Sequence, residues 1–244
     1  CVETSSEETL MDLLKQKEIP IIAESVPTSK AVALVSVNNE QAAFQFGKSI
    51  GENWLKLKKE PVSLLDFTYP LPNTQARSHG FQQGLETALG YKPARLVINA
   101  QSREENAYQL TLDALHTNPG INLVFTVNDT AAVGAMRAFL ELGLDGDQIQ
   151  LAPFGLEGSP VCQALADGVY CQSALAMFPE IAGTLCMDAA CNVIHGIKQP
   201  PVISTPGLIL TSQSLHEYYY PSTAGWRMRP EKWLEMMQNQ PGVH

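Results

Sequence analysis

Polar side chains follow several apolar segments of this chain near the point where each segment ends. Asn38, Asn128 and Glu157 each stand directly or shortly after such a segment, and Arg77 lies early in a helical pattern. Amide, carboxylate and guanidinium groups that meet at one rim of a sheet can hold the hydroxyl or carboxylate groups of a small molecule. These residue types therefore indicate a polar binding site.

Each of these residues also has a purely structural explanation. Asn, Asp and Ser commonly cap helices and fill loops, and Asp129 is a natural cap for the helix pattern that follows it. This explanation accounts for most of the residues taken singly. The recurrence of polar residues after several strands is what favours a shared site.

The elements that would position these residues alternate regularly along the chain. Short apolar runs predict strands, and helical spacing of apolar residues predicts the helices between them. Strict alternation of this kind favours a parallel, doubly wound α/β sheet, in which ligands bind beyond the carboxyl ends of the strands. The expected strands are 19–23, 31–37, 61–67, 95–99, 124–127, 149–154 and 168–174, and the expected helices are 10–17, 40–57, 74–89, 104–115, 159–166 and 179–195.

Length and charge narrow the class of protein. The chain has 244 residues with 45% hydrophobic content, which is enough to form one large or two small cores. Its net charge of -9 disfavours a nucleic-acid surface, so we expect no nucleic-acid partner. No apolar run approaches the length of about 20 residues that a membrane span needs.

The motifs of common enzyme classes are absent from the sequence. It contains neither a Gly-x-Ser-x-Gly elbow nor a Gly-x-Gly-x-x-Gly turn, and its five His are scattered. None of the five Cys forms a close Cys-x-x-Cys pair, so we expect no metal and no cofactor. Cys162 and Cys171 flank a predicted turn and could form a disulfide if their geometry allows. Cys1 is either the lipidated first residue of a bacterial lipoprotein or simply the point where the sequence begins.

Five segments in order resemble one known family. They are 38–47, 76–85, 124–129, 154–160 and 166–168, with the sequences NNEQAAFQFG, ARSHGFQQGL, VFTVND, FGLEGSP and ADG. Together they look like the type I periplasmic binding proteins, the ribose-binding and LacI-like group. The resemblance implies two doubly wound parallel-sheet lobes that close on a ligand in the cleft between them, without any chemistry.

The resemblance also nominates five ligand contacts. Arg77 and Asn128 match family residues that hold the ligand, while Asn38 and Glu157 stand where sugar binders usually carry Asp. Met177 stands at a position that is often Gln. Asn38 lacks the charged acceptor of the usual Asp, and Met177 lacks the amide of the usual Gln. The hydrogen bonds that normally hold a sugar would therefore differ, so a modified sugar or a non-sugar metabolite is an alternative ligand.

The same comparison predicts a division of the chain. Residues 1–59 and 177–200 would form an incomplete N-terminal lobe, because two opening βα units of the family are missing, and residues 60–176 would form the C-terminal lobe. Residues 201–244 would form a closing crossover strand and a C-terminal extension. The aromatic residues of this extension would pack onto the body of the protein or form a contact surface for a membrane partner.

Two functions fit this organisation. One is a solute-binding protein that delivers a sugar or a sugar-like metabolite to an ABC transporter permease or a membrane sensor. Such a protein would be periplasmic or extracellular, and lipid-anchored if Cys1 carries a lipid. The other is the effector-binding core of a LacI-like transcriptional regulator.

Overall fold

The computed structural model describes residues 4–28, 30–57 and 60–239. The strands are Ile22–Glu24 (β1), Ala33–Ser36 (β2), Ser63–Phe67 (β3), Ala94–Ile98 (β4), Leu123–Thr126 (β5), Gln150–Gly155 (β6), Ser173–Ala176 (β7), Val202–Ser204 (β8), Leu208–Thr211 (β9), Tyr219–Ser222 (β10) and Gly225–Met228 (β11). The helices are Thr4–Gln16 (α1), Asn39–Leu57 (α2), Pro72–Leu89 (α3), Glu104–Thr117 (α4), Asp129–Glu141 (α5), Ser159–Asp167 (α6), Pro179–Ile194 (α7), Ser212–Tyr218 (α8) and Pro230–Gln238 (α9).

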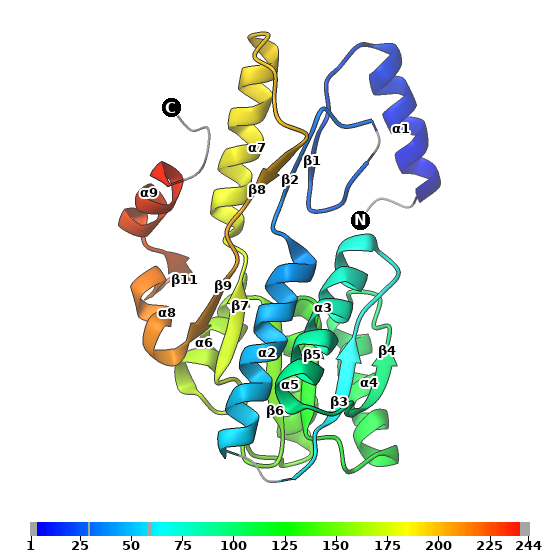
Figure 1. Cartoon of the computed structure of the whole chain (residues 1–244), viewed down its shortest axis with the longest axis vertical. Coiled ribbons are helices and arrows are strands. Elements are labelled where there is room, and N and C mark those ends of the chain that lie inside the picture. Colours follow the sequence, from blue (N-terminus) through cyan, green and yellow to red (C-terminus); the bar gives the residue numbers. More distant parts are fainter. Residues whose placement is uncertain (1–3, 29, 58–59, 240–244) are drawn as a thin grey trace.

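The elements form two α/β lobes of unequal size (Figure 1). The larger lobe holds a six-stranded sheet in the order β4-β3-β5-β6-β7-β9. Its strand pairs are parallel except that β9 runs antiparallel to β7. The smaller lobe holds a three-stranded parallel sheet in the order β1-β2-β8. The predicted α/β architecture of two parallel-sheet lobes is therefore confirmed.

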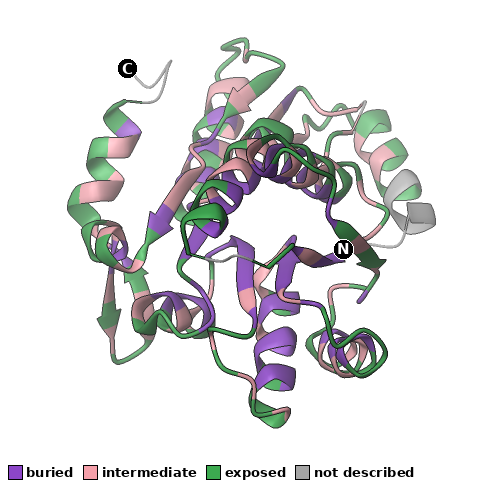
Figure 2. Ribbon diagram, turned by 60° about the horizontal axis from the view of Figure 1, so that its bottom comes forward, coloured by how far each residue is buried: buried purple, intermediate pink, exposed green. Residues whose placement is uncertain are grey.

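The central strands β5, β6 and β7 of the larger sheet are mostly apolar and buried because helices cover both faces. Leu123 and Phe125 of β5 belong to a core shared with α2 and α3, whereas Val124 belongs to the core that also contains residues of α4 and α5. Successive side chains of a strand point to opposite faces, so the side chains on both faces of β5 are buried away from solvent. Figure 2 shows buried strands and inner helix faces, with exposed outer helix faces.

Helices α2 and α3 pack closely through glycines on both helices. A Cβ atom added to Gly47 would lie 2.1 Å from the carbonyl oxygen of Phe81, and one added to Gly84 would lie 1.9 Å from that of Phe44. The glycines let the two backbones approach more closely than larger residues would permit. This interface fixes the start of α2 beside the start of α3, where Arg77 lies.

The α2–α3 contact corrects the predicted division of the chain. The sequence places all of residues 1–59 in the N-terminal lobe, but α2 packs on α3 and contributes Phe46, Ile50 and Trp54 to the core of the larger lobe. The chain therefore crosses between lobes before Asn39. The closing segment also divides, because β8 pairs in the smaller sheet and β9 in the larger one.

We expect Gly84→Ala to destabilise the fold by about 3 kcal/mol, because the new methyl group would overlap backbone atoms and force α2 and α3 apart. Urea unfolding followed by circular dichroism measures the change. The matched control is Gly183→Ala, since an added Cβ at this exposed position of α7 meets no atom within 4 Å. The control should be neutral or slightly stabilising. Equal stability of the two variants would contradict the packing described here.

The smaller lobe leaves large apolar side chains exposed. Met187 and Ile194 of α7 are 65% and 76% exposed, and Leu10 and Leu13 of α1 are also exposed. Helix α7 packs against β1 and β2, two strands of the lobe's three-stranded sheet. No helix in the described part of the chain has the length and apolarity of a membrane span.

The C-terminal extension packs onto the body of the protein. The backbone N–H of Trp226 donates to Ser159 Oγ at 2.9 Å, and its indole Nε1 donates to Gln163 Oε1 at 3.2 Å. Tyr219 is buried and stacks on Phe178 with ring centroids 5.9 Å apart. Of the two readings of this extension, packing onto the body is therefore observed for these aromatic residues. A membrane-partner surface stays a prediction.

Candidate interlobe binding site

Three chain segments join the lobes and lie close together. Residues 37–38 link β2 to α2, residues 177–178 link β7 to α7, and residues 205–207 link β8 to β9. The backbone N–H of Thr205 donates to the carbonyl of Ser36 at 3.1 Å. Phe178 adopts a left-handed backbone conformation with φ 51° at the start of α7. The crossing segments thus form one compact hinge between the two sheets.

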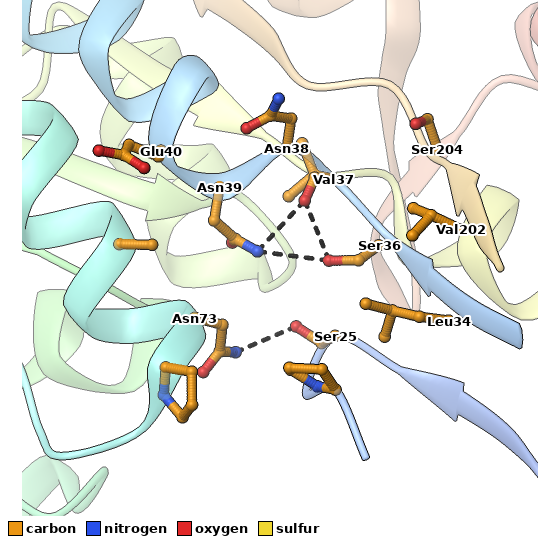
Figure 3. A pocket seen from close by; sticks show the side chains of 13 residues that line it. Ser25, Leu34, Ser36, Val37, Asn38, Asn39, Glu40, Asn73, Val202 and Ser204 are labelled. Carbon is orange, nitrogen blue, oxygen red and sulfur yellow. Dashed lines mark hydrogen bonds between the residues drawn. The ribbon is translucent and has the colours of Figure 1, made fainter. Parts of the chain in front are cut away.

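Several pockets lie beside this hinge, and two of them are lined by residues of both lobes that bear on the candidate site. The first, here called the interlobe cleft, has a volume of about 320 Å³ and is lined by Glu24, Ser25, Val37, Glu157, Met177, Pro179, Ala182, Gly183 and Thr205. The second, here called the hinge pocket, has a volume of about 350 Å³ and is drawn in Figure 3. Ser25 and Val37 line both pockets. The side chain of Asn73 donates to Ser25 Oγ at 3.1 Å, which ties the larger lobe to the smaller one.

Arg77 is buried behind the hinge pocket. Its Nε donates to Asn39 Oδ1 at 2.6 Å, and its Nη1 donates to the carbonyl of Val127 at 2.8 Å. The guanidinium carbon lies 4.5 Å from the centroid of the Phe154 ring. Burial lowers the pKa of Arg77 while the carboxylate of Glu157 raises it, and an Arg side chain stays charged in proteins. Arg77 therefore places a fixed positive charge close enough to interact with Glu157, a residue that lines the interlobe cleft.

Two carboxylates, one from each lobe, face this charge. Glu24 ends β1 in the smaller lobe, and Glu157 follows β6 in the larger lobe. Desolvation raises the pKa of Glu24, and repulsion from Glu157 raises it further. Desolvation also raises the pKa of Glu157, whereas attraction to Arg77 lowers it. The three charged groups thus interact across the space between the lobes.

Asp129 holds the loop that carries Glu157. Its carboxylate accepts backbone hydrogen bonds from Leu156 at 2.8 Å and from Glu157 and Gly158 at 2.7 Å each. Leu156 has a left-handed φ of 51°, so the loop curls around the carboxylate. Burial raises the pKa of Asp129 to about 6, although the three backbone hydrogen bonds oppose this shift. Asp129 therefore fixes the backbone of a cleft residue from the start of α5.

Asn128 has two roles in the structure. Its Oδ1 accepts from the backbone N–H of Ala131 at 3.0 Å and caps α5, so the prediction that Asp129 is the cap is wrong by one residue. Its Nδ2 donates to Ser102 Oγ at 2.8 Å and to the hydroxyl of Tyr69 at 3.2 Å. These partners are themselves polar residues at strand ends. Asn128 thus joins the rim of the larger sheet.

The five nominated residues are only partly brought together. Glu157 and Met177 line the interlobe cleft, and Arg77 interacts electrostatically with Glu157. Asn38 is exposed, caps α2 through a bond from the backbone N–H of Gln41, and lines the hinge pocket instead of the cleft. Its neighbour Asn39, on the inner side of the helix, is the residue that contacts Arg77.

Sequence reasoning missed Glu24, Ser25, Asn39 and Asn73. Glu24 satisfies the rule that nominated the others, because it is a polar residue at the carboxyl end of a strand. The aromatic side chains of Phe67 and Phe178 are buried in the core and do not line the interlobe cleft.

The cysteines do not form an alternative chemical site. Cys162 and Cys171 are free thiols in the buried core. Burial raises the pKa of Cys162 to about 12 and also raises that of Cys171, so both remain protonated near neutral pH. The described residues contain no group of three or more His, Cys, Asp or Glu side chains that could hold a metal ion. Cys1 lies outside the described residues.

Comparison with known proteins connects this geometry to a family. Residues 3–198 match the profile of a family described as "Periplasmic binding protein domain". The chain is 25% identical over 213 residues to the ribose import binding protein RbsB of Bacillus subtilis (strain 168), which covers 84% of this chain. The chain spans 64% of the length of that relative.

Solved structures show the same fold. A Mycobacterium smegmatis protein in complex with β-D-fucofuranose superposes with a TM-score of 0.80 at 19% identity and covers 97% of this chain and 76% of its own. An ABC transporter solute-binding protein of Actinobacillus succinogenes 130z with bound D-allose has a TM-score of 0.75 at 20% identity, with coverages of 86% and 75%. The corresponding protein of Agrobacterium vitis with bound D-fucose has a TM-score of 0.75 at 18% identity, with coverages of 85% and 71%.

Proposed function

Because the chain belongs to the periplasmic binding protein domain family, we propose that it captures a sugar or a sugar-like metabolite between its lobes and closes on it. The family consists of non-enzymatic solute-binding proteins, in agreement with the expectation from the sequence. Delivery to an ABC transporter permease outside the cytoplasm is the proposed consequence of binding. A membrane sensor is the alternative recipient.

The observation that carries this proposal is the meeting of charged groups from both lobes. Glu24 comes from the smaller lobe, and Arg77 and Glu157 come from the larger one. A ligand held by groups on both lobes stabilises the closed arrangement because it binds that arrangement more tightly than the open one. The hinge supplies the flexible connection that such closure needs.

The groups available in the cleft suit a polyhydroxylated ligand. Carboxylates accept hydrogen bonds from hydroxyl groups, and the hydroxyls of Ser25 and Thr205 can donate or accept. Met177 and Pro179 offer apolar surface on which a carbon skeleton can lie. The cleft volume of about 320 Å³ lies at the small end of the usual range for ligand sites, which is compatible with a monosaccharide.

A thermal-shift screen tests the proposal. The panel contains ribose, allose, fucose and arabinose together with amino and N-acetylated hexoses. A ligand at 100 times its Kd should stabilise the protein by about 2.7 kcal/mol, which raises Tm by several degrees. Glu157→Gln should reduce the shift, whereas the surface control Glu52→Gln should preserve it. Absence of a shift with every sugar would contradict the proposed function.

A further inference from the structure

The titratable side chains that line the interlobe cleft are all acidic. Among its lining residues, Glu24 and Glu157 carry charge, and Lys, Arg and His are absent from that set. The two carboxylates belong to different lobes and line the same cleft. Glu180, at the start of α7, adds a further negative charge that repels Glu157. The charged residues that line the cleft are therefore all negative.

Arg77 offsets only part of this charge. Its Nε and Nη1 are bonded to Asn39 and to the Val127 carbonyl, and its guanidinium lies over the Phe154 ring. One guanidinium thus faces two cleft carboxylates, which leaves the site with an excess of negative charge. A neutral ligand would leave this excess in place.

Closure makes the excess charge more costly. When the lobes approach, water leaves the cleft and the repulsion between Glu24 and Glu157 acts through a medium of lower dielectric constant. Repulsion between these groups already contributes to the raised pKa of Glu24. A positive charge placed between the carboxylates would replace repulsion across the cleft by attraction from both lobes. The ligand would then act as the counterion that permits closure.

From this arrangement we infer that the cleft selects a polyhydroxylated ligand carrying a protonated amine, such as an amino sugar, whose ammonium group lies between Glu24 and Glu157. This inference rests on the proposed function and specifies the class of its ligand. An ammonium group supplies three donors and one positive charge, which matches two carboxylate acceptors. Ser25 and Thr205 remain available for the hydroxyl groups of the same ligand.

Calorimetric titration with matched pairs tests the inference. The pairs are D-glucosamine with D-glucose, D-galactosamine with D-galactose and D-mannosamine with D-mannose, each at pH 7.0 and low ionic strength. N-acetylated forms keep the nitrogen but remove its charge. We expect at least one amine to bind about tenfold or more tightly than both its neutral and its acetylated partner, since a charge-assisted hydrogen bond contributes that much.

Variants of the two carboxylates show whether the preference comes from the cleft. Glu24→Gln and Glu157→Gln should each reduce the ratio of amine to neutral affinity, whereas Glu52→Gln on the outer surface of α2 should leave it unchanged. Tighter or equal binding of the neutral partners overturns the inference and leaves the proposed function standing. An amine preference that survives both glutamate substitutions also overturns it. Failure of every sugar in these pairs and in the thermal-shift panel overturns the proposed function together with the inference, whereas binding of a neutral panel sugar with failure of every amine overturns the inference alone.

Discussion

Replacing Asp129 by alanine is expected to lower the free energy of unfolding by about 2 to 4 kcal/mol. The carboxylate accepts hydrogen bonds from three successive backbone N–H groups of residues 156–158, and alanine would leave these donors without their acceptor. The loop would also lose the anchor that holds Leu156 in its left-handed conformation. Urea unfolding at neutral pH measures the loss.

The same substitution should also weaken ligand binding, because the released loop carries Glu157. Asp129→Asn is the informative companion, since an amide oxygen can still accept while its nitrogen meets donors that it cannot bind. Its stability should fall between those of the wild type and the alanine variant. The control Asp113→Ala, at an exposed position of α4, should change stability by less than about 0.5 kcal/mol. If Asp129→Ala behaved like this control, the loop would not depend on Asp129.

The pH dependence of this group has a definite sign. Its pKa rises from 3.8 to about 6 on folding, so the folded protein binds this proton more tightly than the unfolded chain does. Protonation of Asp129 therefore adds a contribution to stability that is full below pH 4 and is lost as the pH rises through about 6. The three backbone hydrogen bonds to its carboxylate act at neutral pH in addition to this contribution. The stability difference between wild type and Asp129→Asn should be larger at pH 4.5 than at pH 7, by up to about 2 kcal/mol. A constant difference would contradict the raised pKa.

The second large effect is expected for Arg77→Ala, which should weaken ligand binding by about 2 to 3 kcal/mol, or roughly 30- to 150-fold in Kd. The substitution leaves Asn39 and the Val127 carbonyl without their donor, so the start of α2 and the end of β5 lose the side chain that joins them beside the site. Calorimetric titration with the sugar of the largest thermal shift measures the change.

Two further variants sharpen this prediction. Arg77→Lys keeps the charge but cannot reproduce the bonds from Nε and Nη1, so it should restore only part of the affinity. Arg137→Ala, on the exposed surface of α5, serves as the matched control and should bind like the wild type. Unchanged affinity of Arg77→Ala would exclude Arg77 from the binding site.

The order of strands and helices in the larger lobe was predictable because local pattern determines it. The apolar run 149–154 predicted β6 to within one residue at each end, and the spacing in 104–115 predicted α4. The end of α6 was less clear. Gly168 takes a left-handed φ of 66° and ends the helix, so β7 begins at Ser173 and not at Gly168 as expected.

Errors arose where packing between distant segments decides the outcome. Nothing in the local pattern of 40–57 shows that this helix joins the larger lobe, because the decision depends on glycines of α3 that face it. The single crossover strand expected at the start of residues 201–244 is instead divided between two sheets, as β8 and β9, for a similar reason. Its residues 205–207 serve the hinge, whose position only the assembled lobes define.

The candidate site shows the same contrast between residues that local pattern points to and residues that only the assembled lobes bring together. The rule that polar residues at strand ends approach a ligand directed attention to Glu157, which lines the interlobe cleft, and applied consistently it would also have nominated Glu24. The choice between Asn38 and Asn39 depends on which side of the first helical turn faces Arg77, a one-residue difference that motif comparison did not resolve. The opposition of Glu24 and Glu157 also requires both lobes to be assembled, since they are 133 positions apart in the chain.

Closure around a ligand is the central claim, and X-ray scattering in solution tests it most directly. The radius of gyration is measured for the protein alone and with a saturating amount of the sugar that gives the largest thermal shift. We expect a smaller radius with the sugar, and a clearly smaller decrease for Arg77→Ala at the same sugar concentration. An unchanged radius for the sugar-saturated wild type would contradict binding by closure of the two lobes.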